Sequence, residues 1–153
     1  MHRRFLYLLL LLTALPVSAA TGRILKVLPQ YLDRKGRNSL SPSLYERDAY
    51  QVYLRENVTN RSALRFNTEW KLKGTATEPL LIRVELRGVA NGNLPKQLTL
   101  EAPVQPKGGW FSHWSAPTLE GEEFKEFGQV TAWRVTLWEG KRLLSSQQSF
   151  LWN

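Results

Sequence analysis

The sequence predicts one mostly β domain, a two-sheet antiparallel sandwich, and three observations lead to this fold class. Apolar and polar residues alternate strictly in several segments, which is typical of strands that bury one face. Turns that contain glycine or proline separate these segments. The chain has 153 residues and no cysteine, so its length suits one domain, and both disulfides and thiolate zinc sites are excluded.

The first 20 residues predict a signal peptide that is removed during export. Arg3 and Arg4 provide a positive start, an apolar run covers residues 5–17, and small side chains end the segment. The run is shorter than the roughly 20 residues that a membrane-spanning helix needs. Cleavage after Ala19 and cleavage after Ala20 both satisfy the requirement for small side chains. We therefore expect a mature bacterial domain over residues 21–153, periplasmic or extracellular and no longer inserted in a membrane.

The first element of the mature chain is predicted as an edge strand and the second as a helix. Residues 23–32 favour a strand, and Pro29 suits an edge because it has no N–H to donate. Residues 44–56 are predicted as a helix, with Ser43 and Glu46 at the spacing of a capping box. A strand over the same residues is the open alternative. The apolar residues at helical spacing on one face are Tyr45, Ala49, Val52 and Tyr53.

From Ser62 onward the period of the sequence changes to two, which predicts antiparallel strands that are wet on one side. The predicted strands of this part cover residues 63–73, 80–87, 97–104, 109–119, 129–138 and 142–152. A short helical turn is predicted over residues 120–128, and Glu139-Gly140 forms the turn of the last hairpin. Together with the first strand, this gives seven strands and one short helix inserted after the first strand.

Seven strands that end in a hairpin resemble an immunoglobulin-like β-sandwich. The cysteines of that fold are missing, so Trp70 and Trp133 are expected to fill the centre by packing alone. The mature chain also resembles a family of small exported bacterial proteins with no assigned function. The segments that carry this resemblance are SLYERDAYQVYLREN, RFNTEWKLKG, LLIRVELRG, GEEFKEFG and AWRVTLWEGKRLLSSQQSFLW. The resemblance implies an immunoglobulin-like β-sandwich and supplies no active-site residues.

The positive charge of the chain fits an acidic or anionic partner, and it fits a role in solubility alone equally well. The net charge is +8 and falls to +6 once Arg3 and Arg4 are removed. Strand alternation places basic residues on the solvent faces with Glu69 and Glu85 between them, so cross-strand ion pairing is as good an explanation as binding. Nucleic acid is not expected, because no motif of an RNA-recognition type is present. The candidate binding residues are Trp138, Arg134, Arg83 and Arg87.

No group of residues in the sequence predicts catalysis. His113 is the one histidine of the mature chain, and with no nucleophile elbow present it is interpreted as an ordinary sheet or loop histidine. The acidic residues of segment 120–128 lack the EF-hand pattern, and we interpret them as the wet side of a turn that Phe124 and Phe127 anchor. We therefore expect no catalytic residue, no metal site and no cofactor.

The leading functional hypothesis is an exported, non-catalytic β-sandwich that binds a protein or an anionic envelope component through a sheet face or an edge strand. The alternative is a carbohydrate-binding module whose exposed tryptophans stack on sugar rings. Trp138 is the tryptophan expected to be exposed, and Trp110 and Trp114 share one strand face. An enzyme that uses His113 is less favoured. A small outer-membrane barrel is also less favoured, because the strand count is odd and the helix is charged.

Overall fold

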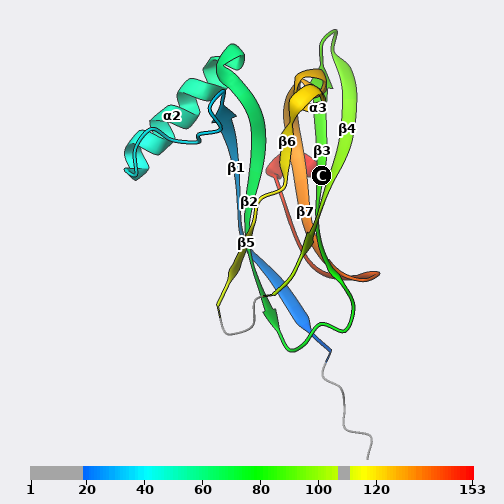
Figure 1. The fold of residues 1–153 in the computed structure, drawn as a ribbon. Coiled ribbons are helices and arrows are strands. Elements are labelled where there is room, and N and C mark those ends of the chain that lie inside the picture. The colour runs from blue at the N-terminus through cyan, green and yellow to red at the C-terminus, as the bar shows by residue number, and fades with distance from the viewer. Residues whose placement is uncertain (1–18, 107–110) are drawn as a thin grey trace, which may run out of the picture.

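The computed structural model describes residues 19–106 and 111–153, which form two antiparallel sheets and two α-helices (Figure 1). The elements are β1 (Thr21–Asp33), α2 (Leu44–Glu56), η1 (Val58–Asn60), β2 (Arg61–Lys73), β3 (Leu80–Ala90), β4 (Leu94–Val104), β5 (His113–Ser115), β6 (Thr118–Glu120), α3 (Gly121–Phe127), β7 (Gln129–Glu139), β8 (Arg142–Gln148) and η2 (Phe150–Trp152). The predicted signal peptide up to residue 18, and Trp110, lie outside the described residues. In the described part, no helix is long and apolar enough to cross a membrane.

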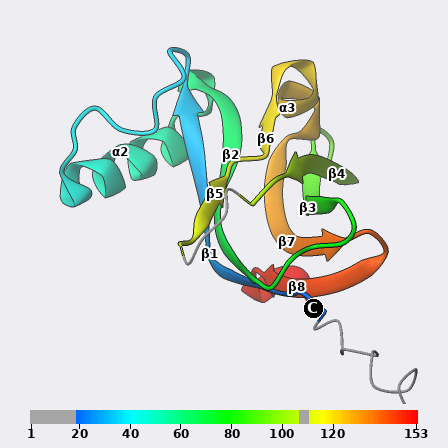
Figure 2. The same ribbon diagram turned by 60° about the horizontal axis from the view of Figure 1, so that its bottom comes forward.

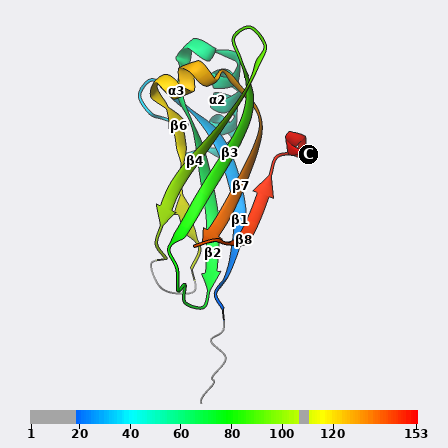
Figure 3. The same ribbon diagram turned by 90° about the vertical axis from the view of Figure 1, so that its right-hand side faces the viewer.

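The sheets form two layers, which Figure 2 shows nearly end-on. In one sheet β1 pairs with β2, and the short strands β5 and β6 pair with two parts of the other edge of β2. The second sheet has the order β4-β3-β7-β8, and Figure 3 looks onto it. The sheets meet where the Ile24 N–H of β1 donates to Ser145 Oγ of β8 at 3.0 Å. Figure 1 shows α2 beside β1, on the side away from the second sheet.

The core lies between the two sheets and consists of the apolar residues that alternate along the strands. Phe66 and Trp70 of β2 are fully buried and belong to one cluster with Ile82 of β3 and Val135 of β7. The ring of Phe66 meets Trp133 edge-on, with 6.1 Å between centroids. Trp70 therefore fills the centre as the sequence predicted, whereas Trp133 is only partly buried.

The helix prediction is confirmed in its bounds but not in its details. α2 covers Leu44–Glu56, so the alternative strand is wrong. The predicted capping box is also wrong, because Ser43 makes no side-chain hydrogen bond at the start of the helix. The residues that α2 buries are Gln51 and Leu54, whereas the apolar face that includes Tyr45 stays exposed. The choice of buried face is thus made by contacts with β1 and not by apolar spacing.

The structure has eight strands where the sequence predicted seven. The predicted strand over residues 109–119 is divided into β5 and β6, with Pro117 in the break. Proline has no N–H for the ladder, and the Pro117 carbonyl instead accepts a hydrogen bond from the Phe66 N–H at 2.8 Å. The predicted strand over residues 142–152 ends early, at Gln148, because Ser149 bonds to Trp133 and the chain then turns into η2.

Candidate functional site

The four residues that the sequence singled out lie together on the outer face of the β4-β3-β7-β8 sheet. Arg83 and Arg87 belong to β3. Arg134 and Trp138 belong to β7, the neighbouring strand. Arg134 is directly opposite Glu85, and its Nε and Nη2 donate to the two carboxylate oxygens at 2.7 and 2.9 Å. This bidentate pair lowers the pKa of Glu85 and raises the pKa of Arg134.

Two tryptophan rings lie against these guanidinium groups. The Cζ atom of Arg87 is 4.0 Å from the ring centroid of Trp152, and Arg87 Nη1 donates to the Trp152 carbonyl at 2.8 Å. Arg134 lies 5.0 Å from the same ring. Arg83 lies 5.3 Å from the ring of Trp138. Each distance is within the range of a cation–π contact, so arginines and indoles stabilise one another along this face.

Two of the three arginines on this outer face are paired with carboxylates, and the third, Arg87, donates to the Trp152 carbonyl. Arg83 Nε donates to Glu101 of β4 at 2.8 Å. Trp138 is half-buried, and its indole N–H donates to Thr136 Oγ1 at 2.8 Å. The four predicted residues are therefore close together and ordered, but their polar groups already have partners. An anion would have to displace those partners, which makes the face a poor anion site.

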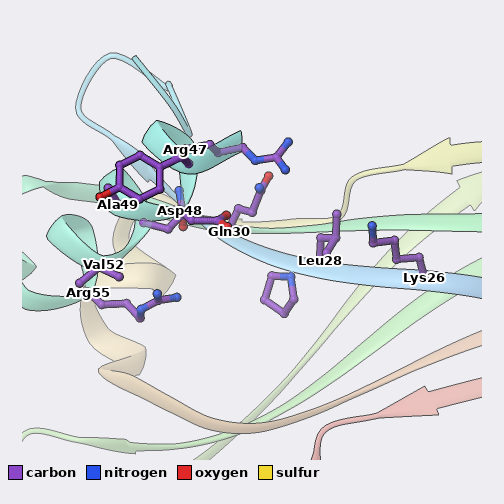
Figure 4. A pocket seen from close by; sticks show the side chains of 11 residues that line it. Lys26, Leu28, Gln30, Arg47, Asp48, Ala49, Val52 and Arg55 are labelled. Atoms are coloured by element: carbon purple, nitrogen blue, oxygen red, sulfur yellow. The ribbon is translucent and has the colours of Figure 1, made fainter. Parts of the chain in front are cut away.

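A groove between α2 and β1 offers positive charge that is not balanced in this way (Figure 4). We call it the α2 groove and define it by residues 26 and 28–30 of β1 and residues 45, 47–49, 51, 52 and 55 of α2. Its volume is about 670 Å³. Strand β1 forms the floor of the groove and α2 forms its wall.

Three cationic side chains surround the α2 groove. They are Lys26 on β1 and Arg47 and Arg55 on α2, and Asp48 is the one acidic residue that lines the groove. None of the three cations forms an ion pair with any residue in the described ranges 19–106 and 111–153. Figure 4 shows Arg47 and Arg55 on α2 and Lys26 farther along β1. The groove therefore has a positive charge that is open to a partner.

Apolar side chains lie among these charges. Leu28 and Pro29 belong to the floor, and Tyr45, Ala49 and Val52 belong to the wall. The Tyr45 side chain is 83% exposed and Val52 is 44% exposed. These wall residues are part of the apolar face that the sequence showed and that the core does not use. Apolar surface beside positive charge is complementary to an acidic partner that also carries apolar side chains.

Side-chain hydrogen bonds hold α2 against β1. The buried amide of Gln51 accepts from the Tyr31 N–H through Oε1 at 2.8 Å and donates to the Tyr31 carbonyl through Nε2 at 2.9 Å. The same Nε2 donates to the Asn38 carbonyl at 2.8 Å. One amide in the middle of α2 thus satisfies three backbone groups and fixes the wall of the groove to its floor.

Gln51 also closes part of the free edge of β1. Hydrogen-bonding direction alternates along an antiparallel pair, so Tyr31, Pro29 and Val27 all direct their backbone groups away from β2. Tyr31 is bound by Gln51, and Pro29 has no N–H. Farther along the strand, a β8 side chain binds the Ile24 N–H. This edge is therefore unsuited to adding a strand from a partner, and a partner would use side chains of the groove instead.

A buried carboxylate fixes the chain between β1 and α2. Asp33 accepts hydrogen bonds from the N–H groups of Lys35 and Arg37 at 2.8 and 2.9 Å and from the Tyr50 hydroxyl at 2.8 Å. The Arg37 guanidinium pairs with it at 2.8 Å. Burial alone would raise the pKa of Asp33, but these hydrogen bonds outweigh burial and hold the pKa well below its ordinary value.

Asp33→Asn should destabilise the fold by about 2 kcal/mol at neutral pH, because the amide cannot accept all of these bonds. Because the pKa of Asp33 is lower in the folded state than in the unfolded state, the ionised carboxylate stabilises the fold fully at pH values above the unfolded pKa of about 4. This stabilisation decreases as the pH falls from there toward the folded pKa. Urea unfolding at pH 7 and at about pH 3 measures both effects. The difference between variant and wild type should shrink at the lower pH, and a constant difference would contradict this role.

The other residues considered for chemistry have structural contacts. The ring of His113 is 4.7 Å from that of Trp70, whose indole N–H donates to Ser115 Oγ at 3.0 Å. Ser112 donates to Glu69 at 2.6 Å. The two hydroxyls that flank His113 are thus engaged with other side chains. Within the residues that the structure describes, no three His, Cys, Asp or Glu side chains are grouped as a metal ion would need.

Lys26, Arg47 and Arg55 were not among the binding residues predicted from the sequence. Arg47 and Arg55 are eight residues apart, so a helix of residues 44–56 brings them toward one side, and this spacing was the available signal. Their proximity to Lys26 had no such signal, because an irregular segment separates β1 from α2. No protein-family model, curated protein or solved structure matches the chain. The α2 groove is therefore interpreted from its own geometry.

Proposed function

We propose that this chain is an exported, non-catalytic, immunoglobulin-like β-sandwich that binds an acidic protein segment in the α2 groove. The observation that carries the proposal is the set of Lys26, Arg47 and Arg55, which surround an apolar groove without ion-pair partners in the described residues. On the outer sheet face, in contrast, Arg134 is paired with Glu85 and Arg83 with Glu101. The remaining arginine of that face donates to a backbone carbonyl and has no ion pair within the described residues.

Strand order supports the immunoglobulin-like assignment. In immunoglobulin-like sandwiches the second strand pairs with the fifth, and the third, sixth and seventh strands form the core of the other sheet. Here β2 pairs with β5 and β6, while β3 pairs with β7 and β7 with β8. If β5 and β6 count as one interrupted strand and β4 as an added edge strand, the order is the same. Export is supported by the leader-like composition of residues 1–20.

The apolar floor favours a protein segment over a uniformly charged polymer. Leu28, Pro29 and Val52 give the groove apolar surface that a polymer of sugars or phosphates would leave unused. An acidic peptide with leucine or phenylalanine side chains would use both parts of the groove. We expect the charge to set the association rate and salt dependence, and the apolar contacts to slow dissociation.

A short fluorescent peptide rich in glutamate, with two leucines, tests this proposal by anisotropy. The peptide should bind, and binding should weaken with added salt because the Debye length shortens to about 8 Å at physiological ionic strength. Matched peptides with lysine for glutamate, or serine for leucine, should bind weakly or not at all. Absence of binding at low salt would contradict the proposal. If the leucine-free peptide and dextran sulfate both bind as tightly as the glutamate-rich peptide with leucines, the groove binds anionic polymers in general, and the proposal of a protein segment is wrong.

The carbohydrate alternative now depends on Trp114 and no longer on Trp138. Trp138 is half-buried beside Arg83, whereas the side chain of Trp114 is 55% exposed. Sugar rings stack on open indole faces, so among the tryptophans of the described ranges Trp114 is the one that this alternative needs. Acrylamide quenching of tryptophan fluorescence, measured with and without envelope glycans, distinguishes sugar binding from peptide binding in the groove. If a glycan reduces quenching in the wild type but not in Trp114→Ala, sugar binding is favoured.

A further inference from the structure

Ala20 belongs to the folded body of the protein, although it lies within the predicted leader. Its side chain is 1% exposed. Its carbonyl accepts a hydrogen bond from Arg142 Nη2 at 2.7 Å. Its backbone lies over Gly74, where an added Cβ atom would come within 3.4 Å of the Ala20 Cα. The preceding residue, Ala19, is exposed. Ala20 is therefore the first buried residue of the described part of the chain, one residue before β1.

The group that holds Ala20 is the half-exposed side chain of Arg142, which also contacts a buried carboxylate at one end of the sheets. This carboxylate belongs to Glu139, whose side chain is 4% exposed. Glu139 Oε1 accepts a hydrogen bond from the Thr77 N–H at 2.8 Å. These contacts, the hydrogen bond from Arg142 first, lower the pKa of Glu139. Removal of Ala20 would take one acceptor from Arg142.

We propose that the leader is removed by hydrolysis of the Ala19–Ala20 peptide bond. Sequence rules allow a cut after either alanine, because Val17 or Ser18 then stands three residues before the bond. The fold distinguishes the two products. A cut after Ala19 removes an exposed residue, whereas a cut after Ala20 removes a buried one with a charge-assisted hydrogen bond.

The reaction is a simple hydrolysis by a membrane-bound signal endopeptidase of the type that requires small side chains before the bond. One water adds across the amide: Ala19 leaves with a new carboxylate, and Ala20 gains an amine that takes up a proton at neutral pH. The peptidase acts on the unfolded chain, so the fold does not guide it. The fold shows instead that the product of a cut after Ala19 keeps the contacts of Ala20, and that the product of a cut after Ala20 loses them.

The new N-terminus would lie beside charges of both signs. Ala20 lines a cavity of about 950 Å³ whose walls include Glu78 and Glu139 and also Lys141 and Arg142. The charge of the new α-amine therefore does not distinguish the two cuts, and the inference depends on the burial of Ala20 and on its hydrogen bond from Arg142. This inference rests on the export part of the proposed function and is independent of the α2 groove.

The cleavage site is tested by expressing the full-length chain in a bacterium and separating the envelope and cytoplasmic fractions. Intact mass and N-terminal sequencing then identify the first residue of the protein in each fraction. We expect an envelope protein that begins at Ala20. A protein that begins at Thr21, or one that keeps residue 1, would overturn the inference. Ala19→Leu should abolish the Ala20 product, because it removes the small side chain before the bond. Peptide binding by the same sample tests the groove separately, so a failure of either proposal is recognisable.

A stability comparison tests whether the fold uses Ala20. Two proteins that begin at Ala20 and at Thr21 are released from a fusion partner without extra residues. The shorter form should melt about 3–5 °C lower, because Arg142 loses an acceptor. In an Arg142→Gln background the two forms should differ much less, since the bond is already weakened. Equal melting temperatures of the two forms in the wild-type background would contradict the structural role of Ala20.

Discussion

Charge reversal at Arg47 and Arg55 should reduce affinity for the acidic peptide by about 30-fold or more. The double variant Arg47→Glu/Arg55→Glu removes two attractive contacts and introduces two repulsive ones. Each of these four contacts of exposed charges contributes roughly 0.5–1 kcal/mol, so the sum is about 2–4 kcal/mol. Neither arginine forms an ion pair with any described residue, so the fold itself should lose little stability. Anisotropy with the glutamate-rich peptide measures the affinity, and thermal melting checks the fold.

A control double variant outside the groove distinguishes the effect of the groove residues on affinity from the effect of the net charge of the protein. Lys73→Glu/Lys141→Glu changes the formal charge by the same amount at exposed positions that do not line the groove. It should weaken binding only slightly, through the long-range field, and the difference should disappear as salt is raised. If both double variants lose affinity equally, the protein binds acidic partners by its overall charge and the groove is not the site.

Gly128→Ala should have the largest effect on stability, about 3 kcal/mol or more. Gly128 ends α3 with φ +78° and ψ −137°, a conformation that residues with a side chain rarely adopt. An added Cβ would lie 2.4 Å from the Val89 carbonyl oxygen and 2.8 Å from the Ala90 Cα. Both are backbone atoms of the central strand β3, so neither can move without disturbing the sheet.

Gly36→Ala is the matched control for this prediction. Gly36 also has a positive φ, +75°, but no atom lies within 4 Å of its added Cβ. Its substitution should cost only about 1 kcal/mol of conformational strain. Urea unfolding of both variants measures the difference. Equal losses would show that the contact with β3 is unimportant and that the backbone angle alone decides the cost.

The sequence predicted the strands and the helix well because their signals are local. The period of two in β2 and β3 and the helical spacing before Asn57 depend only on neighbouring residues. Pro117 divides a predicted strand because it has no N–H for the ladder, which is a local signal that the single strand over residues 109–119 overlooked. The other error arose where a distant contact decides the outcome. Trp152 leaves the last strand and packs on Arg87 and Arg134.

The candidate site was only partly predictable for the same reason. The arginines of the outer face were correctly placed on one side of the strands, and interleaved glutamates were recognised as possible partners. Which glutamate meets which arginine depends on strand register, and the structure places Glu85 opposite Arg134. The α2 groove depends on how Gln51 attaches the helix to β1, a long-range contact that apolar periodicity does not report.

Heteronuclear NMR of the mature protein, titrated with the glutamate-rich peptide, tests the central claim most directly. Amide shifts report where a ligand lies without any substitution in the protein. We expect shifts confined to residues 26–30 of β1 and residues 45–55 of α2, with the outer face around Arg83 and Arg134 unchanged. Shifts concentrated on that outer face, with α2 unaffected, would contradict the assignment of the α2 groove as the binding surface.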